Sequence, residues 1–331
     1  MMPDARVAQL FGEFCRLKTQ VNGPDVHMRT ALSALQDLQL SPREALWWLG
    51  AYTTFCSVPP GVSVWARWRD PAQVLSGSER FYSWIDEHWA GLPIRTQRRP
   101  VRSRRKLVTC ISGMAEWCEF DGPRLGEMNY EEAWSSVDQS VKYYGRYAII
   151  KLLEAFRRAG YSQLEAPNIR PAGAWSPRKM LAYLYPERAE ALRSKSDSRQ
   201  TLAEVNAVAR DALGLLESEL GRSSSFYELE VLLCNARQSI YSGTLYVGRT
   251  IDSELDYWRK SSEHFGDPTL GAFDFFDVRR RTFPVECLGE VQGWPGVRKE
   301  LKTYRGYVWS DLLFDWHKTL ASGNFEHPVR R

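Results

Sequence analysis

Residues 143–154 run Tyr143-Tyr144-Gly145-Arg146-Tyr147-Ala148-Ile149-Ile150-Lys151-Leu152-Leu153-Glu154. Wound as a helix, this stretch carries apolar side chains around nearly its whole circumference, which is typical of a helix buried at the centre of a helical protein. This stretch belongs to a helical region that Asn129 can cap at its N-terminal end and that Gly160 can end. Arg146 and Lys151 are conspicuous on such a helix, because a long cation there either extends to the surface or faces a polar cavity.

Helical patterns continue on both sides of this stretch. Near the start of the chain, Ser41-Pro42-Arg43-Glu44 combines an N-cap, a proline at the first helical position and a capping-box glutamate ahead of an apolar run. No repeat of fixed period is visible. The sequence therefore predicts a mainly α fold, a multi-helix globular bundle with at most a small β element near residues 244–250.

Length and composition narrow the class of protein further. The 331 residues, 38.1 kDa in all, suit one large helical domain or two closely packed ones, so the core needs neither a metal nor a disulfide. No stretch approaches the roughly 20 apolar residues of a membrane helix. The N-terminus carries an acid and lacks the features of a secretion signal. We therefore expect no membrane partner and a cytoplasmic location.

Cysteines and histidines give no sign of a metalloenzyme. The six cysteines form no C-x-x-C pair, and the five histidines have no metal-binding spacing. We expect the cysteines to be small apolar core residues, with a reactive thiol as the alternative. The prediction is therefore no cofactor and no metal site, and assistance by a divalent ion is left open. The absence of nucleotide-binding and kinase motifs disfavours familiar ATP-driven chemistry.

The net charge of +4 conceals one strongly basic segment. Residues 95–106 hold seven cations and no acid, so the rest of the chain has 37 positive against 40 negative charges. We interpret this segment as an exposed loop or arm between an N-terminal region (1–94) and a C-terminal helical region (107–331) that can form one domain with it. Such a segment attracts phosphates, although a solvated linker is the alternative. The side chains expected on a DNA backbone are Arg98, Arg99, Arg102, Arg104, Arg105 and Lys106.

A second group of cations lies at residues 168–179. Ser176 followed by Pro177 predicts a helix start, with a hydroxyl cap and a proline at the first helical position. Arg178 and Lys179 then lie in the first turn, where backbone N–H groups favour an anion, and Arg170 can approach from the preceding loop. The alternative is that these cations face water and that Gly and Pro merely shape a connection.

Further along, acids lie among apolar residues. Glu228 and Glu230 fall in a helical pattern and cannot share one face, so one is expected to be partly buried with a raised pKa or an arginine partner. Asp252 follows a short extended segment and can cap the next helix. Structural ion pairs and a plain N-cap are the alternative roles of these acids.

Three blocks, within roughly residues 115–265, carry a resemblance to a known family. They are Tyr144–Glu154, Asn168–Arg178, and Tyr227–Asn235 with the following Tyr246-Val247-Gly248-Arg249-Thr250-Ile251-Asp252. These blocks are similar to the amino acid:DNA transferases of bacteriophages, also called α-glutamyl/putrescinyl thymine pyrophosphorylases. The first 110 residues and the aromatic tail lie outside the resemblance.

The resemblance implies a step in thymine hypermodification of phage DNA, in the cytoplasm of the infected bacterial host. Hydroxymethyluracil in the DNA is pyrophosphorylated, and an amine or amino acid then displaces pyrophosphate at the 5-methylene carbon. This reaction needs cations at the leaving group, an acceptor for the amine proton, and a surface for a base extruded from the duplex. The implied partners are double-stranded DNA containing the modified thymine and a small amine or amino acid.

The resemblance also implies roles for residues of this chain. The candidates for holding pyrophosphate are Arg170, Arg178, Lys179, Arg249 and Arg146. The candidates for accepting the amine proton or anchoring the amine are Asp252, Glu228 and Glu230. Those for binding the base are Trp175 and Tyr144, by stacking, and Asn235, by contact with its edge. The family pattern has an acid before Ile-Arg, where this chain has Asn168, which puts an acid role at that position in doubt.

Two other functions compete with the transferase. One is a helical DNA glycosylase, which would need a catalytic Asp or Lys near a Gly-rich hairpin, and Asp121-Gly122-Pro123 is only a weak trace of one. The other is a non-catalytic protein that binds nucleic acid through residues 95–106. The sequence identifies neither the amine nor the oligomeric state.

Overall fold

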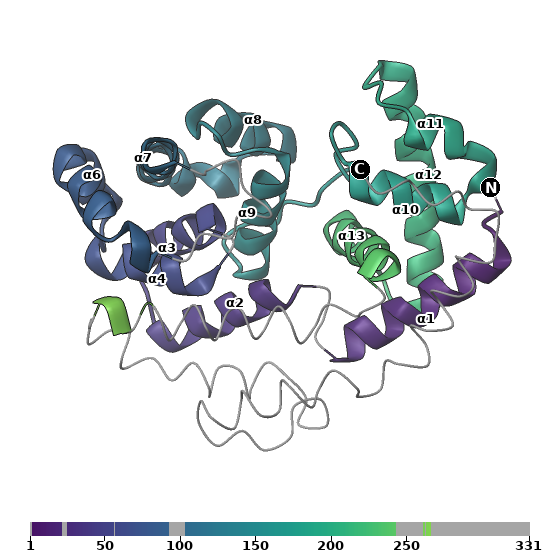
Figure 1. Cartoon of the computed structure of the whole chain (residues 1–331), viewed down its shortest axis with the longest axis horizontal. Coiled ribbons are helices and arrows are strands. Elements are labelled where there is room, and N and C mark those ends of the chain that lie inside the picture. Colours follow the sequence, from purple (N-terminus) through teal and green to yellow (C-terminus); the bar gives the residue numbers. More distant parts are fainter. Residues whose placement is uncertain are drawn as a thin grey trace. The chain divides into compact units, whose positions relative to one another are not determined.

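The fold is entirely helical wherever the chain is described. The computed structural model describes residues 2–21, 25–55, 57–92, 103–242, 261 and 263–265, and every regular element within them is a helix (Figure 1). This confirms the predicted multi-helix α fold. The small β element expected near residues 244–250 lies outside the described residues. No helix in the described ranges combines the length and the apolar character needed to cross a membrane.

The chain forms two compact units, each built from segments that are distant in sequence. We name them the α10 unit and the α9 unit after their central helices. The α10 unit contains α1 (Ala5–Val21), α10 (Trp175–Leu184), η3 (Pro186–Arg188), α11 (Ala189–Arg193), α12 (Arg199–Leu220) and α13 (Phe226–Ser242).

The α9 unit consists of residues 26–165 and 251–282. Its elements are α2 (Val26–Leu38), α3 (Pro42–Phe55), α4 (Val58–Arg67), α5 (Pro71–Ser76), α6 (Ser78–Glu87), η1 (Trp89–Gly91), α7 (Arg104–Phe120), η2 (Gly122–Glu127), α8 (Tyr130–Ser140) and α9 (Arg146–Arg158). Helices on both sides of the basic segment therefore belong to one unit, whereas α1 belongs to the α10 unit.

Tryptophan rings fill the core of the α9 unit, where α3 packs against α4, α7 and α9. Five are fully buried: Trp47, Trp48, Trp65, Trp68 and Trp117. Gly61 permits the close contact of α4 with α3, because a Cβ there would lie 2.7 Å from the Cα of Tyr52. Much of the aromatic surplus in the sequence is therefore core material.

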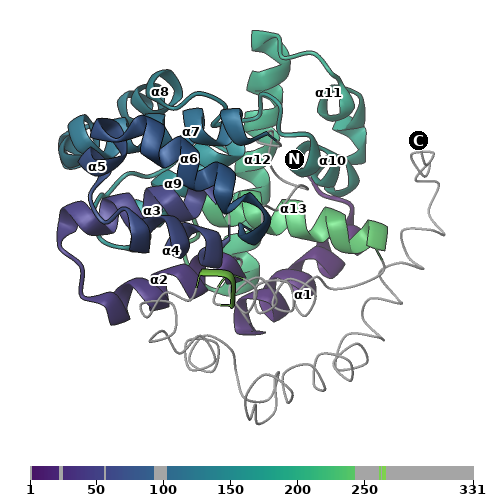
Figure 2. The same ribbon diagram turned by 60° about the vertical axis from the view of Figure 1, so that its left-hand side comes forward.

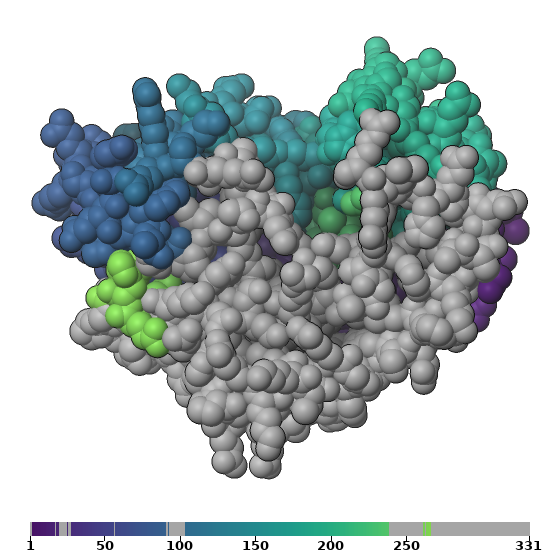
Figure 3. Space-filling model, in the orientation of Figure 1, coloured from purple at the N-terminus to yellow at the C-terminus, as the bar shows by residue number. Residues whose placement is uncertain are grey.

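A short described piece of chain, residues 261 and 263–265, also belongs to the α9 unit. The Phe265 ring stacks on Trp84 of α6, and Nε2 of His264 lies 3.1 Å from Nδ1 of His88. Figure 3 shows this piece in light green at the surface. These contacts hold residues 264 and 265 against Trp84 of α6 and the adjacent His88.

Helix α9 is buried along most of its length, as its sequence predicts. Residues 148–156 are all buried, and the helix is followed by Gly160 at φ +83°, which only glycine adopts readily. Lys151 neither extends to the surface nor faces an empty polar space. Its Nζ lies 2.6 Å from Oε2 of Glu154, one turn further on, and Arg158 lies 3.0 Å from the other oxygen. Arg146, at the start of the helix, is half-buried.

The buried pair makes a testable prediction about stability. Glu154→Gln leaves the Lys151 ammonium buried without its counter-charge, so we expect the free energy of unfolding to fall by about 3–5 kcal/mol. Urea unfolding followed by circular dichroism measures this. The double variant Lys151→Met/Glu154→Leu removes both charges and should lose less. Equal losses in the single and double variants would contradict the ion-pair account.

Two capping boxes expected or suggested by the sequence are present in the α9 unit. The backbone N–H and the hydroxyl of Ser41 both donate to Oε2 of Glu44, at 3.1 and 2.7 Å, and Ser41 Oγ accepts from the N–H of Glu44. Asn129 and Glu132 form the same reciprocal arrangement at the start of α8. The hydrogen bonds from Ser41 hold the pKa of Glu44 below its ordinary value.

The cap of α3 should therefore depend on pH. At neutral pH, Glu44→Gln is expected to lower the free energy of unfolding by about 0.5–1 kcal/mol. The folded pKa lies below the unfolded value of about 4.3, so the contribution of Glu44 is present above that value and disappears as pH falls through the folded pKa. Urea midpoints of both proteins should converge in acid. A gap that stays constant down to low pH would argue against the cap.

In the α10 unit, α10 packs against α13 and α11, and α1 packs against α12 (Figure 2). Phe11 and Phe14 of α1 join Leu216 of α12 and Leu232 of α13 in one apolar core. The backbone N–H of Asp4 donates to the carbonyl of Leu184, which fixes the beginning of the chain to the end of α10.

The described cysteines of both units agree with the expectation of core residues. Cys15, Cys110 and Cys118 are buried free thiols, and Cys234 is half-buried. Burial raises the pKa of Cys15, and the nearby carboxylates of Glu228 and Glu219 raise it further. Burial likewise raises the pKa of Cys118. Such thiols stay protonated and have little nucleophilic character.

Candidate functional site

The loop before α10 has an unusual backbone conformation. Arg170 has φ +50°, in the left-handed region that side chains other than Gly rarely adopt, and its N–H donates to Oδ1 of Asn168 at 2.7 Å. Gly173, at φ +67°, turns the chain into the helix. The side chain of Asn168 thus has a local role, holding Arg170 in a strained turn directly before α10.

Helix α10 begins two residues earlier than its sequence predicts. Trp175 is its first residue and Ala174 precedes it without a side-chain cap, so Ser176 and Pro177 lie inside the first turn. The hydroxyl of Ser176 is engaged elsewhere, because it accepts a hydrogen bond from Nη1 of Arg237 at 2.8 Å. The expected N-cap at Ser176 is therefore wrong, and a partner 61 residues away explains why.

Arg237 is a cation that the sequence analysis did not select. It lies on α13, two residues beyond the third matched block, and the packing of α13 along α10 brings its half-buried guanidinium to the start of α10. Neither its spacing nor its neighbours in sequence distinguish it. Only the contact between the two helices identifies it.

We define the α10-start surface by five residues: Arg170, Trp175, Ser176, Lys179 and Arg237. Trp175 is 39% exposed, and Arg170, Lys179 and Arg237 are half-buried. A helix N-terminus adds a partial positive charge to these cations. Such a surface suits an anionic group that lies next to a flat, stackable ring.

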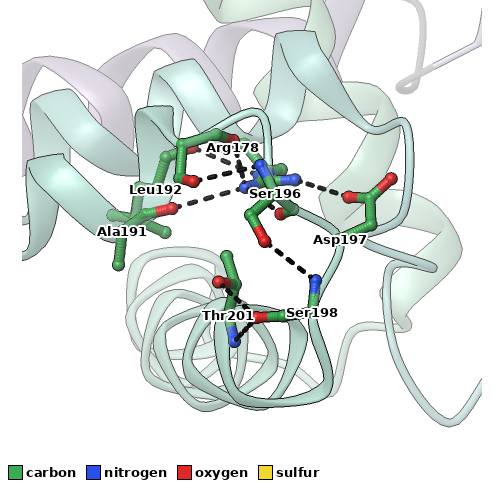
Figure 4. Close-up of polar contacts among 8 residues, drawn as sticks. Arg178, Ala191, Leu192, Ser196, Asp197, Ser198 and Thr201 are labelled. Carbon is green, nitrogen blue, oxygen red and sulfur yellow. Dashed lines mark hydrogen bonds and ion pairs between the residues drawn. The ribbon is translucent and has the colours of Figure 1, made fainter.

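Arg178, in contrast, is fully buried and held on all sides (Figure 4). Its Nε donates to the carbonyl of Leu192, Nη1 contacts Oδ1 of Asp197 at 3.0 Å, and Nη2 donates to the carbonyl of Ser194 at 2.6 Å. Nη2 also lies within hydrogen-bonding distance of the carbonyls of Ala191 and Ser196. Arg178 thus fixes the end of α11 and the loop that leads to α12, so we assign it a structural role in place of pyrophosphate binding.

This role predicts a large loss of stability on truncation. Arg178→Ala leaves several buried carbonyls without a donor, and we expect the free energy of unfolding to fall by about 3 kcal/mol or more. Lys179→Ala, a matched change at the next residue, should stay within about 0.5 kcal/mol of the parent. Chemical denaturation of both variants measures the difference. Parent-like stability of Arg178→Ala would show that the guanidinium is free for other tasks.

The acids of α13 are buried in the α10 unit. Glu228 is 6% and Glu230 2% exposed, so both are buried, although the sequence predicted that only one would be. Glu228 receives Nη1 and Nη2 of Arg222 at 3.0 and 2.6 Å, which fulfils the predicted arginine partner. The hydrogen bond to Glu228 raises the pKa of Arg222. Glu228 therefore has a structural ion pair, and Asn235 further along the helix is half-buried.

Tyr144 and Arg146 belong to the α9 unit. Tyr144 is 2% exposed, and its hydroxyl donates to Oγ1 of Thr53 inside the core. A ring buried in this way has no face for a nucleobase, so the stacking role expected for Tyr144 is withdrawn. Trp175 keeps an exposed ring.

The described part of the basic segment is helical, whereas the sequence suggested a loop or arm. Arg104, Arg105 and Lys106 form the exposed first turn of α7, which Ser103 caps by accepting from the N–H of Lys106. Arg104 pairs with Asp86, and the Lys106 ammonium lies 5.4 Å from the centre of the Tyr143 ring. Arg98, Arg99, Arg102, Arg249 and Asp252 lie outside the described residues.

Comparison with known proteins adds no relative: no family model matches the chain, and no curated protein or solved structure shows significant similarity. Within the described ranges, no group of three or more His, Cys, Asp or Glu side chains is arranged to hold a metal ion. The fold and the site together define a helical protein with an exposed cationic and aromatic surface at the start of α10.

Proposed function

We propose that this chain is a DNA-modifying transferase of bacteriophage thymidine hypermodification. It replaces the pyrophosphate of 5-pyrophosphorylmethyl-deoxyuridine in DNA by an amine or amino acid, a change that protects phage DNA from restriction. Two things support the proposal: the resemblance of three sequence blocks to that family, and the α10-start surface. The second block supplies Arg170, Trp175 and Ser176 and directly precedes Lys179. The third block ends two residues before Arg237 on α13, which packs on α10.

The observation that carries the proposal is the hydrogen bond from Arg237 to Ser176 beside the exposed ring of Trp175. In the displacement, the C–O bond between the methylene carbon and pyrophosphate breaks, and its electron pair goes to the leaving oxygen. The cations of Arg170, Lys179 and Arg237 stabilise that developing charge. Trp175 stacks on the extruded base, so the ring and the leaving group are held side by side.

The amine requires a different part of the site. A new C–N bond forms at the methylene carbon, and the amine proton passes to a carboxylate. The resemblance offers Glu228, Glu230 and Asp252 for this step, and of these Glu228 is held by Arg222. Asn235 is the candidate for the edge of the base. The exposed cations of residues 104–106 hold the DNA backbone.

The test is a transfer assay on DNA carrying pyrophosphorylated hydroxymethyluracil. The DNA is incubated with the protein and glycine, glutamate, serine or putrescine, then hydrolysed to nucleosides for mass spectrometry. A new amine adduct with release of pyrophosphate supports the transferase. Release of free base indicates a glycosylase, and DNA binding without any product indicates a non-catalytic binder. Either result refutes the transferase.

Arg237→Gln should lower the rate of pyrophosphate release by about a hundredfold, since it removes one cation from the developing charge. Arg210→Gln, an exposed arginine of α12 in the same unit, is the matched control and should keep the parent rate. Circular dichroism of both variants checks that they fold. Equal rates in the two variants would remove Arg237 from the site.

A further inference from the structure

Three exposed arginines of the α9 unit lie over two buried tryptophan rings. The guanidinium carbons of Arg67 and Arg80 lie 5.3 and 5.2 Å from the centre of the same ring, that of Trp68. The guanidinium carbon of Arg69 lies 4.0 Å from the centre of the Trp65 ring. We name these three residues the α4–α6 arginines, because Arg67 and Arg69 lie at the end of α4 and Arg80 lies in the first turn of α6. Contact with one shared ring places Arg67 and Arg80 at one site.

The rings give these arginines a fixed base. Trp68 is 1% exposed, and the Phe81 ring packs against it edge to face at 5.5 Å. Trp65, one turn earlier, is fully buried. A guanidinium that lies over a ring uses its planar face for that contact and keeps its N–H groups available to an acceptor. Side chains held in this way lose less conformational freedom when they bind a ligand.

The α4–α6 arginines differ from other arginines that lie over a tryptophan ring. Arg104 and Arg178 also lie over such rings, but Arg104 pairs with Asp86 and Arg178 with Asp197. Within the described part of the chain, no carboxylate pairs with any of the α4–α6 arginines, including that of the adjacent Glu79. Their contacts with the rings therefore leave their charge uncompensated.

The acids closest to Arg69 have other partners. Asp70 follows it in sequence, but Oδ1 of Asp70 accepts from Nη2 of Arg43 at 2.9 Å and also caps α5. The charge of Arg69 also acts on Glu44, whose Oε2 accepts from the backbone and hydroxyl of Ser41. The positive charge at these rings thus lacks a counter-charge that is free to move to it.

Donors without acceptors extend to the rings themselves. The buried indole N–H groups of Trp65 and Trp68 have no hydrogen-bond partner. Together with the three guanidinium groups they give this part of the α9 unit an excess of donors. A ligand that fits such a surface is negatively charged and brings several acceptor oxygens.

We propose that Arg67 and Arg80, with Arg69 over the neighbouring ring, form a binding site for phosphate groups at the end of α4 and the start of α6. Planar guanidinium groups match the oxygen geometry of a phosphate and donate to it through charge-assisted hydrogen bonds. The phosphodiesters of a DNA backbone and free pyrophosphate share this chemistry. The site belongs to the α9 unit and does not rest on the proposed transferase activity.

The test compares three double variants of the full chain with the parent. Arg67→Met/Arg80→Met keeps an apolar stem over the ring without the charge, and Arg67→Lys/Arg80→Lys keeps the charge without the planar donors. Arg124→Met/Arg157→Met, in the same unit, is the control matched in charge, since each of these arginines already pairs with an acid. Titration calorimetry with pyrophosphate and fluorescence anisotropy with a labelled DNA duplex are performed at constant ionic strength. Circular dichroism checks that the variants fold.

The methionine variant should bind at least about tenfold more weakly than the parent, and the control should stay within about twofold of it. The lysine variant should fall between them, at least about threefold weaker than the parent, because an ammonium cannot replace the two parallel donors of a guanidinium. A loss with pyrophosphate identifies a free anion as the ligand. A loss confined to the duplex identifies the DNA backbone, and the slope of log affinity against log salt should then fall by about two.

Two results would overturn the site. One is an affinity of the methionine variant equal to that of the control in both arms. The other is parent-like affinity of the lysine variant, which would reduce the effect to net charge. If the methionine variant does not fold, the lysine variant decides by itself. All these readouts are binding measurements, so failure of this site and failure of the proposed function are distinguishable.

Discussion

The ion pair between Lys151 and Glu154 is the interaction on which the α9 unit depends. A helix that is apolar around most of its surface can be covered on all sides only if its charged side chains find partners without water. The spacing of three residues lets α9 supply both charges itself. Helices α2, α3 and α8 can then pack against it. The unit gains a central helix that is buried from Ala148 to Phe156, with both charges of the pair on the helix itself.

Helix α10 also buries a charged side chain, Arg178. Its partners lie outside α10, at the end of α11 and in the loop that follows. Arg178 is buried by contacts with carbonyls at the end of α11 and with the loop that precedes α12, together with Asp197. Those carbonyls are the groups that a helix end leaves without partners, so one guanidinium satisfies several of them at once. A cation in the first turn of a helix can therefore be a structural element, and its position in the sequence does not distinguish that role from anion binding.

Local interactions were predictable from sequence, and interactions between distant segments were not. The caps at Ser41 and Asn129 depend on residues three positions away, so the sequence pattern was sufficient for both. Ser176 has the same local pattern, yet Arg237 competes for its hydroxyl. Tyr144 likewise lies in a matched block but is buried against Thr53. Burial and partner choice depend on which helices pack together, and periodicity within one helix carries no information on that.

The proposed polyanionic partner would meet the positive charge that lies at the surface. Buried cations in the described chain, such as Lys151 and Arg178, contact acids or carbonyls that compensate their charge. Their charge is therefore not available to a ligand. The first turn of α7 and the α10-start surface instead keep cations at least partly exposed, and each includes an aromatic ring nearby. Exposed cations can reach a phosphate, whereas the nitrogens of the buried Arg178 guanidinium already donate to protein oxygens. The proposed transferase would need cations that a ligand can reach, which is the reason to propose Arg170 and Arg237, and not Arg178, for the leaving group.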